Sequence, residues 1–460
     1  MLKTAYKTWL DCRNIRTRRE RFKRYTYGRQ WEDIVFDPVS GRNRPEREIV
    51  ENTGRSPITN NVIRQLVKTI VGKFRNDRIL PEDKQLLNIY NRNLLPELDS
   101  RLLEEFLISG VAVQRVTREC RRPGVMETFV DNVNPDDFFI NAIRDPRGWD
   151  VEILGELRDM SLRELLMRYG NGDRTRMEWL RHLYSDPSNS SLDSNILGDP
   201  ASHNFFESPT GRCRVIEVWS LEMDERIRCL DPLNNRCYDL PAGEISHISD
   251  RNRKREKVGK PHIKTRMANT PAWKCRVYAP DGTLLDEHPS LAPHGEHPYV
   301  VKLYPLTDGE VHPFVEDVID QQRHINRLIT MIDHIMGVSA KGVLLFPTEA
   351  KIDQLSWNDI SHQWSTCGGI IPYRSLGAKQ PTQITSGGVD AGASKMVEMQ
   401  MKLIQEVSGV NDAISGKNLG AGVGADRYQQ QVQNATVAML DLMETFNSLL
   451  SLRDRKLLLT

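Results

Sequence analysis

The sequence lacks a strong net charge, a regular cysteine pattern and long apolar runs. Its formal net charge is only +1 over 460 residues, so the overall charge gives no case for a nucleic-acid binder. Its seven cysteines are scattered, odd in number and without a CxxC pair, which excludes a disulfide framework and is typical of reduced thiols in the cytoplasm. No stretch approaches ~18 consecutive apolar residues, so we expect no membrane span.

Catalytic motifs are missing as well. Two histidines and a glutamate lie within residues 293–298, but the prolines at both ends of this stretch exclude the helical face of a metalloprotease. The glycines of Gly420–Gly424 lack the Lys-Ser/Thr ending of a phosphate-binding loop, and the acidic turn Asn134–Asp137 needs no cation. There is no GxSxG elbow. We therefore expect no catalytic residue, no metal and no cofactor.

The basic residues are unevenly distributed. Residues 1–30 hold ten lysines and arginines and are expected to form a basic helix. Residues 251–266 are also basic, and Gly259 and Pro261 within them favour an exposed loop. Either run could contact DNA or an acidic partner, and a solvated surface is the alternative for both. The candidate contacts are Arg18, Arg19, Arg253, Lys254 and Arg255.

The middle of the chain shows the alternation of strands. Gly110–Val116 and Val215–Leu221 alternate in side-chain character as strands do, and Pro280-Asp281-Gly282 joins two short apolar arms as a hairpin turn. The region 209–304 is therefore expected to be rich in β-structure. Together with the helices around it, this pattern predicts an α+β fold.

The pattern changes after Pro313. Apolar positions then recur by threes and fours along a helix of about 25 residues, roughly 37 Å long. Because this seam covers less than half of the helix, we expect the helix to line something or to pack beside copies of itself. The seam consists of Val315, Val318, Gln322, Ile325, Ile329, Ile332 and Met336.

Residues 342–460 continue with four further segments. A β-prone piece (Gly342–Ile384) is followed by a shorter helix with Met396, Met399, Leu403 and Val407 on one side. A glycine-rich loop then leads into a long amphipathic helix.

The order of these motifs resembles the portal protein family of tailed bacteriophages, whose members are head-to-tail connector subunits. The resemblance rests on a helix that begins Phe314–Asp320 and continues Arg323-His-Ile-Asn326, on the strand Gly342–Phe346, and on Glu406–Asn411 before the glycine-rich loop. Two upstream stretches, Tyr25–Trp31 and Ile58–Asn61, are also similar to the N-terminal region of portals.

The resemblance implies a portal-like division of the chain. The expected parts are a mixed α/β wing (1–311), a stem helix (312–337), a small β-containing clip (338–388), a second stem helix (389–407), a tunnel loop (408–424) and a long helix (425–460) toward a crown. The chain stops before a crown, so the presence of this part is open.

The same resemblance implies the function of a portal protein in the virion, with no enzymatic activity. About twelve copies would form a ring, a homododecamer with a DNA channel, at one capsid vertex. The ring would conduct double-stranded DNA during packaging and ejection and dock the terminase large subunit, then the head-tail adaptor protein. The major capsid protein and the scaffolding protein are further expected partners, and assembly is expected in the host cytoplasm.

The channel is expected to have two surfaces. The stem would present a mildly acidic wall. Such a wall suits DNA sliding, because a wall rich in Lys and Arg would neutralise many phosphates and bind the duplex tightly. In the tunnel loop, Lys417 would touch phosphate. The expected stem residues are Glu316, Asp320, Arg323 and Arg327, and the expected loop residues are Asp412, Gly416, Lys417, Asn418, Gly420 and Gly422.

Two other readings of the sequence stay open at this point. One is another virion connector or head-completion ring protein, although such proteins are usually shorter and lack two helices around a β-module. The other is a nucleic-acid-processing enzyme that uses the basic runs and an acidic cluster. A constellation of carboxylates on facing strands would favour the enzyme, and the sequence offers none.

Overall fold

The computed structural model describes residues 1–122, 124–185, 204–208, 211–290, 295–339, 343–366, 370–375, 379–384, 391–410, 437 and 439–459. Helices make up 48% and strands 25% of the structure, which confirms the α+β class. Among the described helices, none is long and apolar enough to cross a membrane.

The chain folds into two compact units, each built from distant parts of the sequence. The sheet unit comprises Met1–Arg18, Asp77–His312 and Asp441–Thr460. The hairpin unit comprises Arg19–Asn76 and Pro313–Leu440. The expected borders of wing, stem and clip follow the chain order instead, and they stay a prediction.

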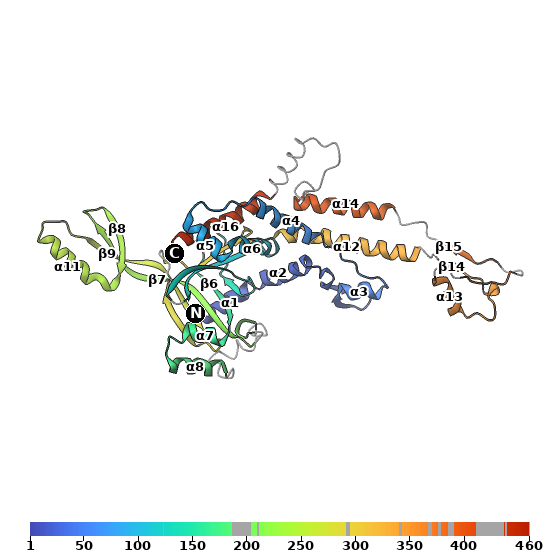
Figure 1. Ribbon diagram of the computed structural model, residues 1–460, viewed down its shortest axis with the longest axis horizontal. Coiled ribbons are helices and arrows are strands. Elements are labelled where there is room, and N and C mark those ends of the chain that lie inside the picture. Colours follow the sequence, from blue (N-terminus) through green and yellow to red (C-terminus); the bar gives the residue numbers. More distant parts are fainter. Residues whose placement is uncertain are drawn as a thin grey trace. The chain divides into compact units, whose positions relative to one another are not determined.

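The sheet unit contains a large antiparallel sheet of order β10-β9-β7-β6-β5, with β8 paired to β7, and two smaller sheets of order β11-β3-β4 and β12-β13 (Figure 1). The large sheet consists of β5 (Phe138–Ile140), β6 (Ile153–Met160), β7 (Cys213–Asp231), β8 (Arg236–Pro241), β9 (Lys264–Tyr278) and β10 (Leu284–Pro289). The smaller sheets consist of β3 (Val111–Arg122), β4 (Val125–Asn132), β11 (Tyr299–Leu303), β12 (Pro305–Thr307) and β13 (Glu310–Val311).

Helices surround these sheets. They are α1 (Leu2–Asp11), α5 (Lys84–Asn93), α6 (Leu95–Ser109), α7 (Leu162–Tyr169), α8 (Arg174–Ser185), the 3-10 turn η2 (Ala242–Glu244), α11 (Ile245–Glu256) and α16 (Leu440–Leu459). The basic N-terminal segment forms α1 and then α2 (Arg13–Thr26), which crosses from the sheet unit into the hairpin unit. The expected N-terminal helix is thus two helices.

The large sheet is buried on both faces, as the alternation in β7 predicts. Val215 and Trp219 lie in a core with β9, α7 and α8, whereas Ile216 and Val218 pack with α1 on the other face. Burial of apolar area on both faces stabilises the sheet by about 25 cal/mol per Å². The side chain of Tyr6 lies in the second core against Phe205, with ring centroids 5.3 Å apart.

The structure confirms one expected turn and corrects one expected loop. Asp281 accepts a hydrogen bond from the backbone N–H of Thr283 (2.9 Å) in the turn between β9 and β10. The prediction of an exposed loop over residues 251–266 is wrong for residues 251–256, because these residues belong to α11. Gly259 and Pro261 follow the end of this helix and do not prevent it.

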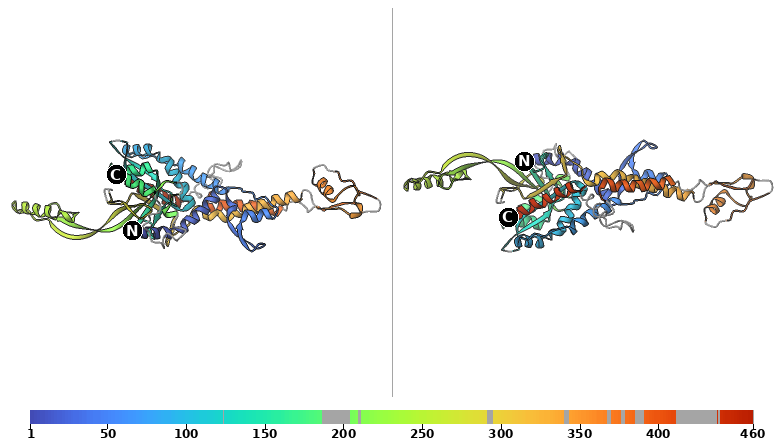
Figure 2. Two further views of the ribbon diagram at one scale, coloured as in Figure 1. Left: turned by 90° about the horizontal axis from the view of Figure 1, so that it is seen from below. Right: turned by 90° about the horizontal axis from the view of Figure 1, so that it is seen from above.

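The hairpin unit is built around two helices, α12 (Phe314–Ser339) and α14 (Ala391–Ser408), which lie side by side in Figures 1 and 2. Between them in the sequence lie β14 (Val343–Leu345), which pairs with β15 (Thr382–Ile384), the turn η3 (Thr348–Ala350) and α13 (Trp357–Ser365). The N-terminal part of the unit adds η1 (Gln30–Glu32), β1 (Ile34–Asp37), β2 (Arg42–Pro45), α3 (Glu46–Asn52) and α4 (Val62–Asn76).

Candidate channel elements

The long helix α12 presents three buried polar side chains, one turn apart, to the segment before α4. The Gln322 carboxamide oxygen accepts hydrogen bonds from the backbone N–H groups of Val62 (2.9 Å) and Ile63 (3.2 Å). The oxygen atoms of Asn326 and Thr330 accept from the N–H groups of Asn60 and Ile58, both at 3.0 Å. The first two backbone N–H groups of α4, those of Val62 and Ile63, are thus satisfied by α12.

The same contact joins three of the stretches that carry the resemblance to portals. Gln30 donates to the backbone carbonyl of Tyr25 (2.8 Å) and to the side chain of Asn61 (3.2 Å), and it accepts from Asn326. The Trp31 indole donates to the carbonyl of Ile58 (3.3 Å). The sequence showed these stretches only as separate motifs, and the structure brings them together in one buried network.

Two of the expected stem residues, Arg323 and Arg327, share one buried carboxylate within the chain. Glu46 is 4% exposed and accepts from the guanidinium groups of Arg323 (2.9 Å) and Arg327 (2.6 Å). Asp320 is exposed and Glu316 is half-buried. The cations expected in the stem are therefore offset by a carboxylate that sequence reasoning did not connect with them.

The seam of α12 changes along its length. Val315, Val318 and Ile325 are fully buried, whereas Met336 near the end of the helix is 54% exposed. On α14, the expected apolar side is exposed too, and we call it the α14 stripe: Met396, Met399 and Val407 are 48%, 59% and 48% exposed. Leu403, the fourth expected member, is half-buried. Among the described residues, the seam is thus fully buried as far as Ile325, half-buried at Ile329 and Ile332, and exposed at Met336.

The expected contact residues differ in exposure. Arg18 is half-buried and lies 3.4 Å from the ring nitrogen Nδ1 of His312, and Arg19 is only 3% exposed. Arg255 is paired with Asp231 (2.7 Å), whereas the side chain of Arg253 is 80% exposed. Lys254 is exposed.

The tunnel loop falls mostly outside the described residues. Ser408–Val410 are described and close α14, and the expected residues Asp412, Gly416, Lys417, Asn418, Gly420 and Gly422 lie outside them. The expected helix 425–460 is described as α16 from Leu440 on. The glutamate-histidine stretch 293–298 is described only from residue 295. Within the described ranges, no three His, Cys, Asp or Glu side chains are grouped to hold a metal ion.

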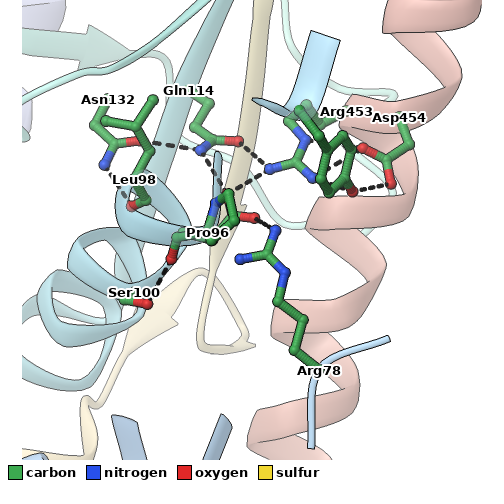
Figure 3. Close-up of polar contacts among 10 residues, drawn as sticks. Arg78, Pro96, Leu98, Ser100, Gln114, Asn132, Arg453 and Asp454 are labelled. Carbon is green, nitrogen blue, oxygen red and sulfur yellow. Dashed lines mark hydrogen bonds and ion pairs between the residues drawn. The ribbon is translucent and has the colours of Figure 1, made fainter. Parts of the chain in front are cut away.

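A buried ion-pair cluster attaches α16 to the sheet unit (Figure 3). Arg453 on α16 and Asp99 on α6 are both fully buried and form an ion pair. Asp99 also accepts from Arg78 (2.9 Å) and from Gln114 on β3 (3.2 Å). Arg453 donates to the hydroxyl of Tyr90 on α5 (2.7 Å).

Burial and charge oppose each other in this cluster. Burial raises the pKa of the Asp99 carboxyl, and the positive charges of Arg453 and Arg78 lower it in part. For Tyr90, burial is the largest cause that raises the pKa to about 12, which keeps its hydroxyl protonated as a donor to Asp454 (2.7 Å). The buried charges of Asp99 and Arg453 therefore stabilise each other, and the loss of either one would leave the other buried without this partner.

The Gln322 contact predicts a loss of stability on substitution. Gln322→Met keeps the length of the side chain but leaves the buried amide of Ile63 without an acceptor, which costs about 1–3 kcal/mol. The amide of Val62 also loses a bond and keeps only the carbonyl of Asn60 (3.0 Å). Urea unfolding should show this loss, while the control His324→Gln, an exposed change on the same helix, should leave the midpoint unchanged. Equal midpoints for both variants would contradict the role of Gln322.

The Arg453 cluster predicts a larger effect. Arg453→Met removes one partner of a buried ion pair and leaves Asp99 with Arg78 alone, which should reduce the free energy of unfolding by about 3–5 kcal/mol. The matched control Arg455→Met lies two residues further on α16, where the side chain is exposed, and should change it by less than about 0.5 kcal/mol. If both variants unfold alike in urea, the cluster does not hold α16.

The comparisons with known proteins agree with this arrangement. No curated protein matches the chain. The phage P22-like portal protein family matches it over residues 83–449, a span that includes the strands of the sheet unit and the helices α12 and α14. Portal proteins are structural, non-enzymatic subunits that form an oligomeric ring at the capsid vertex, through which DNA passes. Because the match covers most of the sequence, the chain belongs to the phage P22-like portal protein family.

Proposed function

We propose that about twelve copies of this chain form one closed ring that conducts double-stranded DNA during packaging and ejection. In this proposal the ring docks the terminase large subunit first and the head-tail adaptor protein later, and it contacts the major capsid and scaffolding proteins. The observation that carries the proposal is the α12–α14 hairpin within the span that matches the portal family.

The parts of a portal are proposed for particular elements. The helices α12 and α14 serve as the two stem helices, and the small module of β14, α13 and β15 between them serves as the clip. Residues 408–424 serve as the tunnel loop, and α16 continues beyond it. The support is the order of these elements, a helical hairpin interrupted by a small two-stranded sheet.

The apolar surface left on the hairpin supports assembly into a ring. The α14 stripe and Met336 expose large apolar side chains on a helical surface, where single-chain proteins usually carry polar residues. In a cyclic ring, each copy presents such a surface to a different surface of the next copy, and the contact repeats until the ring closes.

The charges of the stem support passage of DNA without tight binding. Glu46 pairs with both Arg323 and Arg327 and offsets one of their two charges, so these arginines are less available to grip phosphates. Asp320 remains exposed on the same helix. A wall with few free cations binds duplex weakly, because affinity rises steeply with the number of phosphates that are neutralised.

Ring formation can be tested with the α14 stripe. Wild-type protein should give rings with a central channel in negative-stain images and the mass of the ring in light scattering. Met399→Glu would bury a charge between neighbouring copies and should yield smaller species, whereas Met399→Leu keeps the surface apolar and should still form rings. A monomeric wild-type protein at micromolar concentration in physiological salt would overturn the proposal.

The tunnel loop can be tested separately from assembly. Lys417→Glu and a deletion of 418–423 should both leave rings intact, because neither removes an apolar seam residue, while the amount of DNA packaged or retained per head falls. Lys7→Glu, an equal charge change at an exposed position of α1, is the control. Normal packaging by both loop variants would show that the loop is not a tunnel element.

A further inference from the structure

The sheet unit carries an arm, residues 224–269, that extends from its large sheet. In the large sheet, β6 pairs with β7 only over Cys213–Ser220, whereas β9 continues alongside β7 as far as Leu230. Beyond the sheet, β8 pairs with the last residues of β7, and α11 follows β8 in the sequence. Figure 1 shows α11 together with β8 and β9 at the end of this arm.

The arm has a small core of its own, which fixes the orientation of α11. Ile248 on α11 is buried together with Ile227, Cys229 and Ile263 of the neighbouring strands and loop. Asn252 on the same helix accepts from the backbone N–H of Ile263 (2.8 Å) and donates to its carbonyl (3.0 Å). One side of the helix is therefore held against the strands.

An ion pair completes this attachment. Arg255 donates to both carboxylate oxygens of Asp231 at 2.7 Å. This hydrogen-bonded contact lowers the pKa of Asp231 to about 2. Its contribution to stability is thus present above the unfolded pKa of about 4 and is lost as the pH falls toward 2, so the ion pair is intact at neutral pH.

Most of the basic side chains of α11 and of the segment from there to the start of β9 are exposed. Between residues 245 and 266 the sequence has eight basic side chains and only two acidic ones. Of the eight, Arg255 is used for the attachment, and Arg253 lies 3.9 Å from Asp250 while its side chain stays 80% exposed. The exposed basic residues are Arg251, Arg253, Lys254, Lys257, Lys260, Lys264 and Arg266.

The composition of this surface distinguishes between two kinds of partner. Interfaces between proteins are enriched in aromatic residues and depleted in lysine. The stretch 245–266 contains no Phe, Trp or Tyr and four lysines. Contacts with the sugar-phosphate backbone, in contrast, need only exposed Lys and Arg and carry no requirement for a central apolar patch. The surface therefore fits phosphate better than protein.

We propose that the end of the arm, formed by α11 and the start of β9, binds the backbone of duplex DNA without sequence preference. The residues of this site belong to the sheet unit, and the proposal does not depend on the proposed function. Arg251, Lys254 and Lys257 are spaced by three residues, which brings them to neighbouring positions along α11 and the turn that follows it. They form the centre of the site.

The test uses covalently closed circular duplex DNA as the probe, because a closed circle cannot thread through an assembled ring. The triple variant Arg251→Gln, Lys254→Gln, Lys257→Gln is compared with a matched variant that neutralises three exposed arginines of α7 and α8: Arg163→Gln, Arg174→Gln, Arg181→Gln. Dissociation constants are measured by gel shift at several salt concentrations.

The expected result is a loss of affinity of at least tenfold for the arm variant at low salt, with the slope of log K against log salt reduced in magnitude by about 2–3, since each lost phosphate contact contributes about 0.9. The matched variant should stay within twofold of wild type. Unchanged binding by the arm variant, or an equal loss in both variants, would overturn the proposal.

A second probe, poly-glutamate, tests whether the arm binds an acidic protein instead of DNA. If the arm variant keeps DNA affinity but loses binding to poly-glutamate that the wild type has, the arm recognises an acidic protein and the proposal is wrong. Negative-stain images of the same samples report ring formation independently. Absent rings together with arm-dependent DNA binding would contradict the proposed ring and leave the arm site intact.

Discussion

The contact between Asp99 and Arg453 decides how the last helix of the chain is held. A buried ion pair adds little net stability compared with apolar residues, because both charges must leave water. Its effect is on geometry. If α16 turned or slid by one residue, Arg453 would leave its partners and Asp99 would keep a buried charge with Arg78 alone. The register of α16 that is observed avoids this cost.

The hairpin unit follows the same principle with neutral groups. Gln322, Asn326 and Thr330 accept hydrogen bonds from backbone N–H groups of residues 58–63. These bonds favour one rotation and one axial position of α12 relative to that segment. Apolar contacts alone would tolerate several arrangements of two long helices, since volume and pattern are satisfied by more than one of them. The polar contacts exclude the alternatives, because each would leave buried donors without acceptors. This rotation leaves Met336 exposed near the end of α12.

Much of this fold could be predicted from the sequence, and the omissions have a common cause. Apolar spacing predicts α12 and α14, and the turn at Pro280–Gly282 predicts the β9–β10 hairpin. The same spacing also contains a signal for the cluster. Arg453 follows Leu442, Phe446 and Leu449 on the apolar side of α16, where a charge needs a buried partner. The identity of that partner could not be found, because Asp99 lies 354 positions away and nothing local points to it.

The charged residues show most directly what composition cannot provide. A sequence reveals how many cations a segment has, but tertiary contacts decide which of them remain available. Arg323, Arg327 and Arg255 are each paired with a carboxylate of another element, whereas Arg253 on the same turn as Arg255 is exposed. The helix α11 itself is a case of this kind, because an isolated helix of twelve residues is marginal in water. Its attachment through Ile248, Asn252 and Arg255 holds the helix and leaves its other cations exposed, so that a chain with a net charge of +1 has a strongly basic surface there.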